Sequence, residues 1–75
     1  MDKSESILAE LKKRGFRITR QKKLLIDIIA SGEYYGAKEI YYEAIKKDPG
    51  IGIATTYRMV RTLEEIGAID RKIKL

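Results

Sequence analysis

The sequence of 75 residues contains no cysteine and no histidine. Without cysteine it can form no disulfide, and without either residue it lacks the usual ligands of a transition-metal site. Carboxylates alone can hold Mg²⁺ or Ca²⁺, but no Asp-rich loop is present. The same absences leave few side chains for acid–base or nucleophilic catalysis, so an enzyme is the interpretation that the sequence supports least.

Long apolar runs are also missing. No run approaches the length of about 20 residues that a membrane-spanning helix needs, and residues 1–6 lack the apolar region of a secretory signal. We therefore expect a cytoplasmic protein with no membrane partner. The length predicts one domain over residues 1–75, in which folding buries about 60% of the surface of the unfolded chain.

Positive charge is in excess, because 16 Lys and Arg residues face 11 Asp and Glu, which gives a net charge of +5 and a pI near 9.6. This favours a polyanionic partner such as nucleic acid, although many small soluble domains are also basic. The charge is unevenly distributed. Between Glu10 and Asp27 the charged residues are all basic, namely Lys12, Lys13, Arg14, Arg17, Arg20, Lys22 and Lys23.

Apolar periodicity and capping residues predict four helices, with Ser4 or Ser6 capping the first and Thr19 capping the second. The fourth is expected to stop at Gly67 in the left-handed conformation. We expect helices to about residue 14 and over 20–31, 37–47 and 53–66. Their inner faces are predicted to comprise Ile7, Leu8, Leu11, Leu24, Leu25, Ile28, Ile29, Ala37, Ile40, Tyr41, Ala44, Ile45, Ile53, Thr56, Met59, Val60, Leu63 and Ile66.

The basic residues fall where the first predicted helix ends and the second begins. Cations at the end of a helix favour its dipole, which is sufficient to explain Lys12 to Arg14. Cations in a first turn are unfavourable, so Arg20, Lys22 and Lys23 point to an external phosphate as a compensating partner.

The outer face of the fourth predicted helix carries small residues, hydroxyls, one aromatic ring and two arginines in place of the usual Glu, Lys and Gln. Ala54 and Thr55 permit close approach, and Tyr57 can pack on a thymine methyl or bond a phosphate. Arg58 and Arg61 can reach guanine edges or phosphates. This face is suited to a DNA major groove, although an amphipathic core helix with incidental arginines is an open alternative.

The third predicted helix, the turn at residues 48–50 and the fourth helix read as a helix-turn-helix whose second member enters the groove. After Gly67, apolar and polar residues alternate in part, as in a strand that begins a wing. The return strand is missing. The predicted fold class is therefore a mainly α winged helix-turn-helix, with about four helices and a short, truncated β wing.

Three segments together carry a resemblance to a known family: Arg17-Ile18-Thr19-Arg20-Gln21-Lys22, Gly52-Ile53-Ala54-Thr55-Thr56-Tyr57-Arg58-Met59-Val60 and Leu63-Glu64-Glu65-Ile66-Gly67-Ala68-Ile69. They resemble the N-terminal domain of the ferric uptake regulator (Fur) family of bacterial metalloregulatory repressors. The most specific part is Ala-Thr-x-Tyr-Arg with its downstream acidic pair and glycine. The resemblance runs from about Leu11 to Ile69, which corresponds to the first half of a typical member.

The resemblance implies the DNA-reading head of a transcriptional repressor, which binds double-stranded DNA at an AT-rich palindromic operator. Tyr57 and Arg58 would read the major groove, and Arg17 would enter the minor groove, whose AT-rich form has an enhanced negative potential. The full-length protein would be a homodimer, whereas the isolated domain is expected to be monomeric. The DNA-binding residues are predicted to be Arg17, Thr19, Arg20, Lys22, Lys23, Ala54, Thr55, Tyr57, Arg58 and Arg61.

The resemblance places the metal, which would be Fe, Zn or Mn, in a C-terminal domain absent from this sequence, with peroxide or haem as the signal in some branches. No cofactor or metal site is expected in these 75 residues. The sequence departs from the family pattern in two places. Members often carry a histidine just before the third helix, where the nearest residues here are Glu33, Tyr34 and Tyr35, and Arg20 stands where proline is common.

An alternative function is a winged helix that binds another protein. Its interface would use Tyr57, Met59 and the Tyr34-Tyr35 pair. Salt separates the two functions, because DNA binding through basic residues weakens steeply with salt while an aromatic interface does not.

Overall fold

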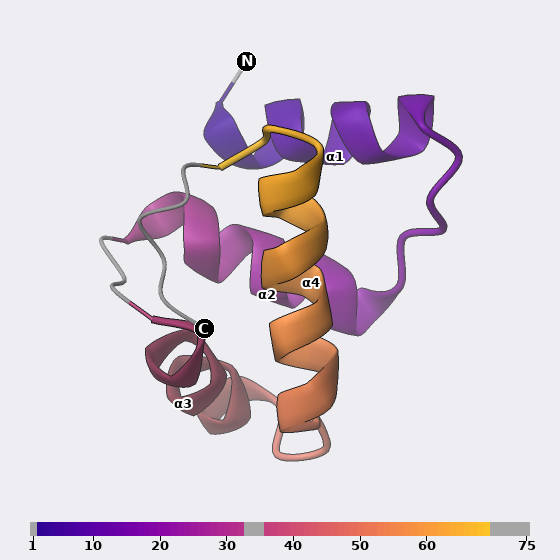
Figure 1. Ribbon diagram of the computed structural model, residues 1–75. Coiled ribbons are helices and arrows are strands. Elements are labelled where there is room, and N and C mark those ends of the chain that lie inside the picture. Colours follow the sequence, from indigo (N-terminus) through magenta and orange to yellow (C-terminus); the bar gives the residue numbers. More distant parts are fainter. Residues whose placement is uncertain (1, 33–35, 70–75) are drawn as a thin grey trace.

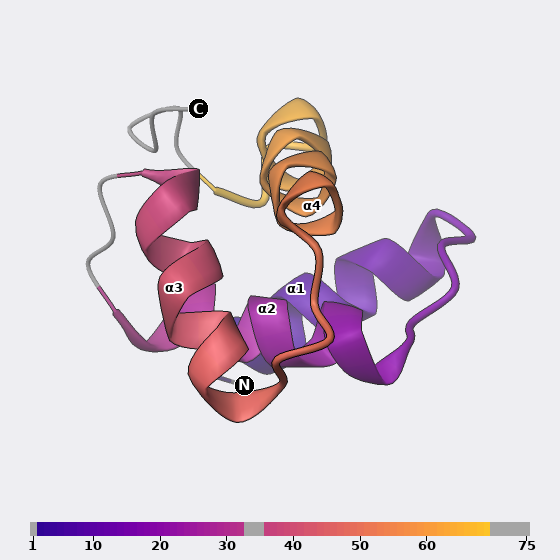
Figure 2. The same ribbon diagram turned by 90° about the horizontal axis from the view of Figure 1, so that it is seen from below.

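The computed structural model describes residues 2–32 and 36–69, and this part of the chain is mainly helical (Figures 1 and 2). Its helices are α1 (Lys3–Lys13), α2 (Arg20–Ser31), α3 (Ala37–Lys47) and α4 (Ile53–Glu65). The four predicted helices are thus confirmed in order and approximate extent. The predicted wing strand falls on residues that lie almost wholly outside the described part. None of the described helices has the length and apolar character needed to cross a membrane.

The ends of the helices follow from their capping residues. Thr19 caps α2 as predicted, and its hydroxyl accepts a hydrogen bond from the backbone N–H of Lys22 at 3.2 Å. Gly67, at φ +76°, follows α4 in the predicted left-handed conformation. The prediction of Ser4 or Ser6 as the cap of α1 is wrong. Asp2 takes that position, where its carboxylate accepts from the N–H of Glu5 at 2.8 Å and adds a favourable charge at the helix N-terminus.

α2 lies at the centre of the molecule and packs against each of the other three helices, while α3 also packs against α4 (Figures 1 and 2). This position explains why Ile26 is buried although the predicted stripe of α2 omitted it. A helix with neighbours on three sides buries more of its circumference than a single stripe. The buried apolar residues are Ile7, Leu11, Leu25, Ile26, Ile28, Ile29, Ala37, Ile40, Ala44, Ile51, Met59, Val60 and Leu63.

The turn between α3 and α4 is held by Asp48, whose carboxylate accepts a hydrogen bond from the N–H of Gly50 at 3.0 Å. Ile51 leaves this turn toward the core and is 3% exposed. The prediction that Ile53 is buried is wrong, since 46% of it is exposed. Ile53 is the first residue of α4, and the apolar contact expected of it is made by Ile51.

Thr56 is the buried polar residue on α4. Its hydroxyl lies 3.3 Å from the carbonyl oxygen of Gly52, one turn earlier, and donates a hydrogen bond to it. The hydroxyl is therefore satisfied within its own helix, as a buried polar group must be. The predicted inner face of α4 is confirmed at Thr56, Met59, Val60 and Leu63, with Ile66 half-buried.

Candidate nucleic-acid interface

The side of α4 that faces away from the core carries the residues singled out from the sequence. Ala54, Arg58 and Arg61 are exposed, whereas Thr55 and Tyr57 are half-buried. Tyr57 packs against the edge of the core, so part of its ring is fixed by the fold. A side chain held in this way loses little conformational freedom when it contacts a ligand.

The link between α1 and α2, residues 14–19, supplies the second basic element. Arg17 and Thr19 are exposed in this link. The Nζ atom of Lys22 donates a hydrogen bond to the carbonyl oxygen of Arg17 at 3.0 Å, which joins the link to the first turn of α2. Arg14 pairs with Glu10 at 2.8 Å on the surface of α1, so its charge is partly compensated within the chain.

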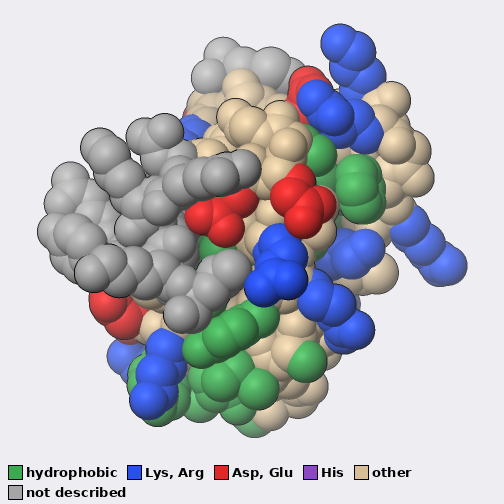
Figure 3. Space-filling view, viewed as in Figure 1, with side chains coloured by type: hydrophobic (Ala, Val, Ile, Leu, Met, Phe, Trp, Pro, Cys, Tyr) green, Lys and Arg blue, Asp and Glu red, His purple; other side chains and the backbone are tan. Residues whose placement is uncertain are grey.

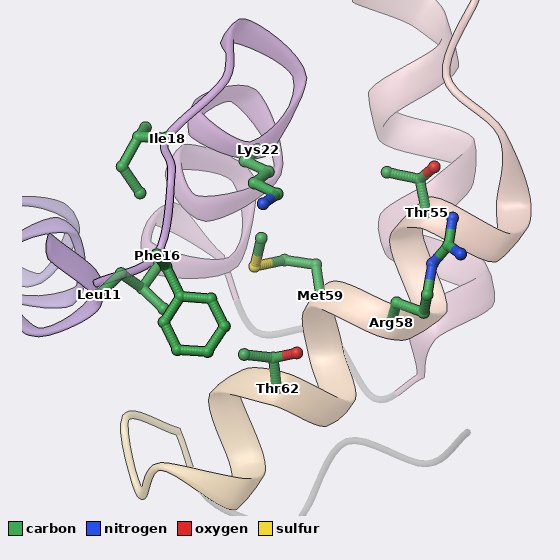
Figure 4. Close-up of a pocket in the computed structure, with 8 residues that line it drawn as sticks. All are labelled: Leu11, Phe16, Ile18, Lys22, Thr55, Arg58, Met59 and Thr62. Carbon is green, nitrogen blue, oxygen red and sulfur yellow. The ribbon is translucent and has the colours of Figure 1, made fainter. Parts of the chain in front are cut away.

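The two elements meet around an open pocket of about 380 Å³. Figure 4 shows that its walls come from the end of α1, the link, the start of α2 and the face of α4. The Phe16 ring is turned toward α4 beside Thr62, and the Lys22 side chain extends from α2 into the space opposite Met59 (Figure 4). The lining residues are Leu11, Phe16, Ile18, Lys22, Thr55, Arg58, Met59 and Thr62.

Basic side chains gather on the same side of the molecule. Figure 3 shows Lys and Arg over α4 and over the side where Figure 1 places the link. Acidic side chains are scarcer there, and on α4 they occur late, as Glu64 and Glu65. A ligand that lies across the N-terminal half of α4 and the link therefore meets mainly positive charge.

The first turns of the helices also differ in charge, and those of α2 and α4 are the less acidic. α1 has Glu5 and α3 has Glu39 in the first turn, whereas α2 and α4 have no acid in theirs. Gly52 at the start of α4 has no side chain to cap it, so N–H groups of this turn are open to an outside acceptor. The helix dipole favours a negatively charged acceptor at such a position.

The predicted site residues are brought together only in part. Lys22, Thr55 and Arg58 line one pocket although α3 and a turn separate them in the sequence. Arg20 and Lys23 are exposed at the start of α2 and are not among the residues that line this pocket. Phe16, which the sequence analysis did not single out, forms a wall of the pocket. Its position directly before Arg17, in a basic link, is the signal that could have identified it.

The described residues contain no group of three or more Asp, Glu, Cys or His side chains arranged to hold a metal ion. The metal that the family resemblance implies therefore finds no fitting set of ligands among residues 2–32 and 36–69. No step in the function of this part of the chain is assigned to a metal.

Comparison with known proteins adds a family match. The model of the ferric uptake regulator family matches residues 13–74. The chain is 40% identical over 63 residues to the ferric uptake regulation protein of Brucella suis biovar 1, which covers 83% of this chain and 45% of that protein. It is 36% identical over 66 residues to the peroxide-responsive repressor PerR of Staphylococcus epidermidis, covering 87% and 44%.

A third relative comes from Archaeoglobus fulgidus. Its ferric uptake regulation protein homolog is 32% identical over 68 residues, which covers 88% of this chain and 53% of that protein. The chain thus spans about half the length of the curated relatives that it matches.

Proposed function

The chain belongs to the ferric uptake regulator family, and from this premise we propose that it binds double-stranded DNA in a sequence-specific manner as the reading head of a transcriptional repressor. The observation that carries the proposal is the pocket in which Lys22 of α2 meets Thr55 and Arg58 of α4. Two basic elements that share one open face suit a ligand that extends across both of them. Duplex DNA, with its regularly spaced phosphates, is such a ligand.

In the proposed complex, α3, the turn and α4 act as a winged helix-turn-helix, and α4 enters the major groove. The exposed Arg58 and the half-buried Tyr57 are the base readers. Arg17, on the exposed link, enters the neighbouring minor groove. The remaining contacts to phosphates or close backbone approaches are assigned to Thr19, Arg20, Lys22, Lys23, Ala54, Thr55 and Arg61.

The operator is proposed to be AT-rich and palindromic, because Arg17 favours the narrow AT minor groove and a dimeric repressor reads two related half-sites. The homodimer is proposed for the full-length protein. The metal response of such a repressor is proposed for parts of the protein other than the described residues, which hold no fitting ligands.

The test compares a base reader with a phosphate contact on DNA that the chain itself selects from a randomised pool. Arg58→Ala is expected to lower discrimination at one base pair by about 1–3 kcal/mol, because a bidentate arginine distinguishes guanine from other bases. Lys23→Ala is the matched control, since it is exposed in the first turn of α2. It is expected to weaken selected and unrelated DNA alike, and to reduce the salt slope by about 0.9.

Binding is measured by fluorescence anisotropy over a salt series for both variants. If Arg58→Ala keeps the specificity ratio of the unchanged chain, α4 does not read the groove through this residue. If the chain binds no duplex even at low salt, an interface with protein replaces DNA binding as the function. Of the residues that this alternative would use, Met59 is buried, Tyr57 is half-buried, and Tyr34 and Tyr35 lie outside the described residues.

A further inference from the structure

The link and α4 form walls of one pocket, and the proposed function assigns the link to the minor groove and α4 to the major groove. On the basis of the DNA binding proposed above, we infer that this pocket seats the sugar–phosphate strand that separates the minor groove from the major groove. Phe16 and Thr62, which are not among the residues proposed to read bases in either groove, contact DNA in this arrangement. Lys22 becomes the ligand of one particular phosphate.

Adjacent minor and major grooves of a duplex are separated by one backbone strand, so a protein with one element in each groove must straddle that strand. Here one element is the link that carries Arg17, and the other is α4 with Arg58. The space between them is the pocket of about 380 Å³. The strand that divides the grooves therefore passes through this pocket.

The lining suits the carbon atoms of deoxyribose. Leu11 and Met59 form a buried apolar floor. Phe16 stands beside it with 40% of its surface exposed, which is unusual for a phenylalanine in so small a domain. Its ring lies beside Thr62 of α4 (Figure 4). A sugar seated over Phe16 and Thr62 would cover apolar surface that otherwise meets water.

The charge of the lining suits one phosphate. An ammonium group has three N–H donors, and Lys22 uses one of them on the carbonyl oxygen of Arg17. The others can donate to a phosphate oxygen, as can the hydroxyls of Thr55 and Thr62. None of the described residues that line the pocket is acidic, so nothing there repels a phosphate.

Arg58 contributes differently. Figure 4 shows its stem at the wall of the pocket and its guanidinium group extended alongside Thr55, away from Phe16. The guanidinium group of Arg58 thus points away from the place proposed for the strand, and it remains available to contact base edges. Lys22 and Arg58 share a pocket but serve the backbone and the bases respectively.

The first experiment changes the apolar wall. Phe16→Ala is expected to weaken binding to selected and unrelated duplexes by the same factor, about fivefold, because it removes a half-exposed apolar contact with the backbone. The salt slope should not change, since no charge is lost. Tyr42→Ala is the control, because Tyr42 is a comparably exposed aromatic residue, 49% exposed, on α3 and outside the pocket. It should bind as the unchanged chain does.

The second experiment locates the phosphate. Duplexes that carry one neutral methylphosphonate linkage at successive positions of the selected site are bound by the unchanged chain and by Lys22→Gln. At one linkage per half-site, between the minor-groove and major-groove contacts, neutralisation should weaken binding of the unchanged chain about tenfold and leave Lys22→Gln unaffected. A Thr62→Val chain, which keeps its shape and loses its hydroxyl, should show a partial loss of the same effect.

The outcomes separate this inference from the proposed function. If Phe16→Ala binds DNA like the unchanged chain, or no single linkage couples to Lys22, the strand does not lie in the pocket. DNA binding with specificity lost in Arg58→Ala would then still support the proposed function. If the unchanged chain binds no duplex at all, both fail. Thermal unfolding of each variant shows whether a loss of binding reflects a loss of folding.

Discussion

Two isoleucines close together in the sequence, Ile51 and Ile53, have opposite environments. Ile51 is 3% exposed and Ile53 is 46% exposed. Ile51→Ala is expected to lower the free energy of unfolding by about 2–5 kcal/mol, because it leaves a cavity in the core. Ile53→Ala should lower it by about 1 kcal/mol or less, because its side chain gains little from burial. Urea unfolding of the two variants measures both values, and equal losses would contradict the burial pattern.

The same pair shows where periodicity fails as a predictor of single residues. A helical stripe assumes that partners cover the whole length of the helix. Thr56, Met59, Val60 and Leu63 fit this assumption, because they are buried where α4 packs into the core. Ile53 does not fit it, since α4 begins there. Ile51 precedes the helix, so no helical pattern could select it.

At the scale of elements, α2 depends on the residue that starts it. Thr19→Ala is expected to lower the free energy of unfolding by about 0.5–2 kcal/mol, because the N–H of Lys22 loses its acceptor. Thr19→Ser keeps a hydroxyl and should retain most of the stability. Denaturant unfolding of both variants compares them directly. If Thr19→Ala were as stable as the unchanged chain, the cap would contribute nothing.

The helices were predictable because their signals are local. Thr19 marks a helix start through its side-chain hydroxyl, and Gly67 marks a helix end through its backbone conformation, so the sequence predicts both ends to within about a residue. Asp2 was not chosen as a cap, because two serines nearby fit the same rule. The link has no periodic pattern at all. Its basic character could be predicted, whereas the wall formed by Phe16 and the bond from Lys22 to Arg17 depend on how α1 and α4 pack.

At the scale of the whole molecule, the described residues form one small unit in which the other three helices pack against α2. Such a unit contains one copy of α4, so we expect the 75-residue chain to be monomeric and to contact one half-site. Two copies joined by a flexible linker that spans both half-sites should bind a palindromic duplex about 10²–10⁴ times more tightly than one copy does. Anisotropy titrations measure the gain. A tight dimer of the single chain in light scattering would overturn this expectation.

The order of helices and the class of partner could be inferred from patterning, charge and motif. The arrangement of residues in the candidate site could not be inferred from these features. Lys22 and Arg58 are far apart in the sequence, and their meeting depends on α1 and α4 both lying on α2. Within α2, Ile26 is buried although no single stripe indicates it. Tertiary packing, which the sequence encodes only collectively, decides the spacing of the two basic elements.

The central place of α2 also bears on the spacing between the link and α4. The link runs directly into α2, and α4 packs against α2, so α2 sets the spacing between the two basic elements. If both elements contact one duplex as proposed, the chain should favour duplexes whose backbone contour matches that spacing, even among sequences that present identical base edges. Stiff, narrow-grooved tracts would be preferred over pliable ones, and the protein would then discriminate by form as well as by letters.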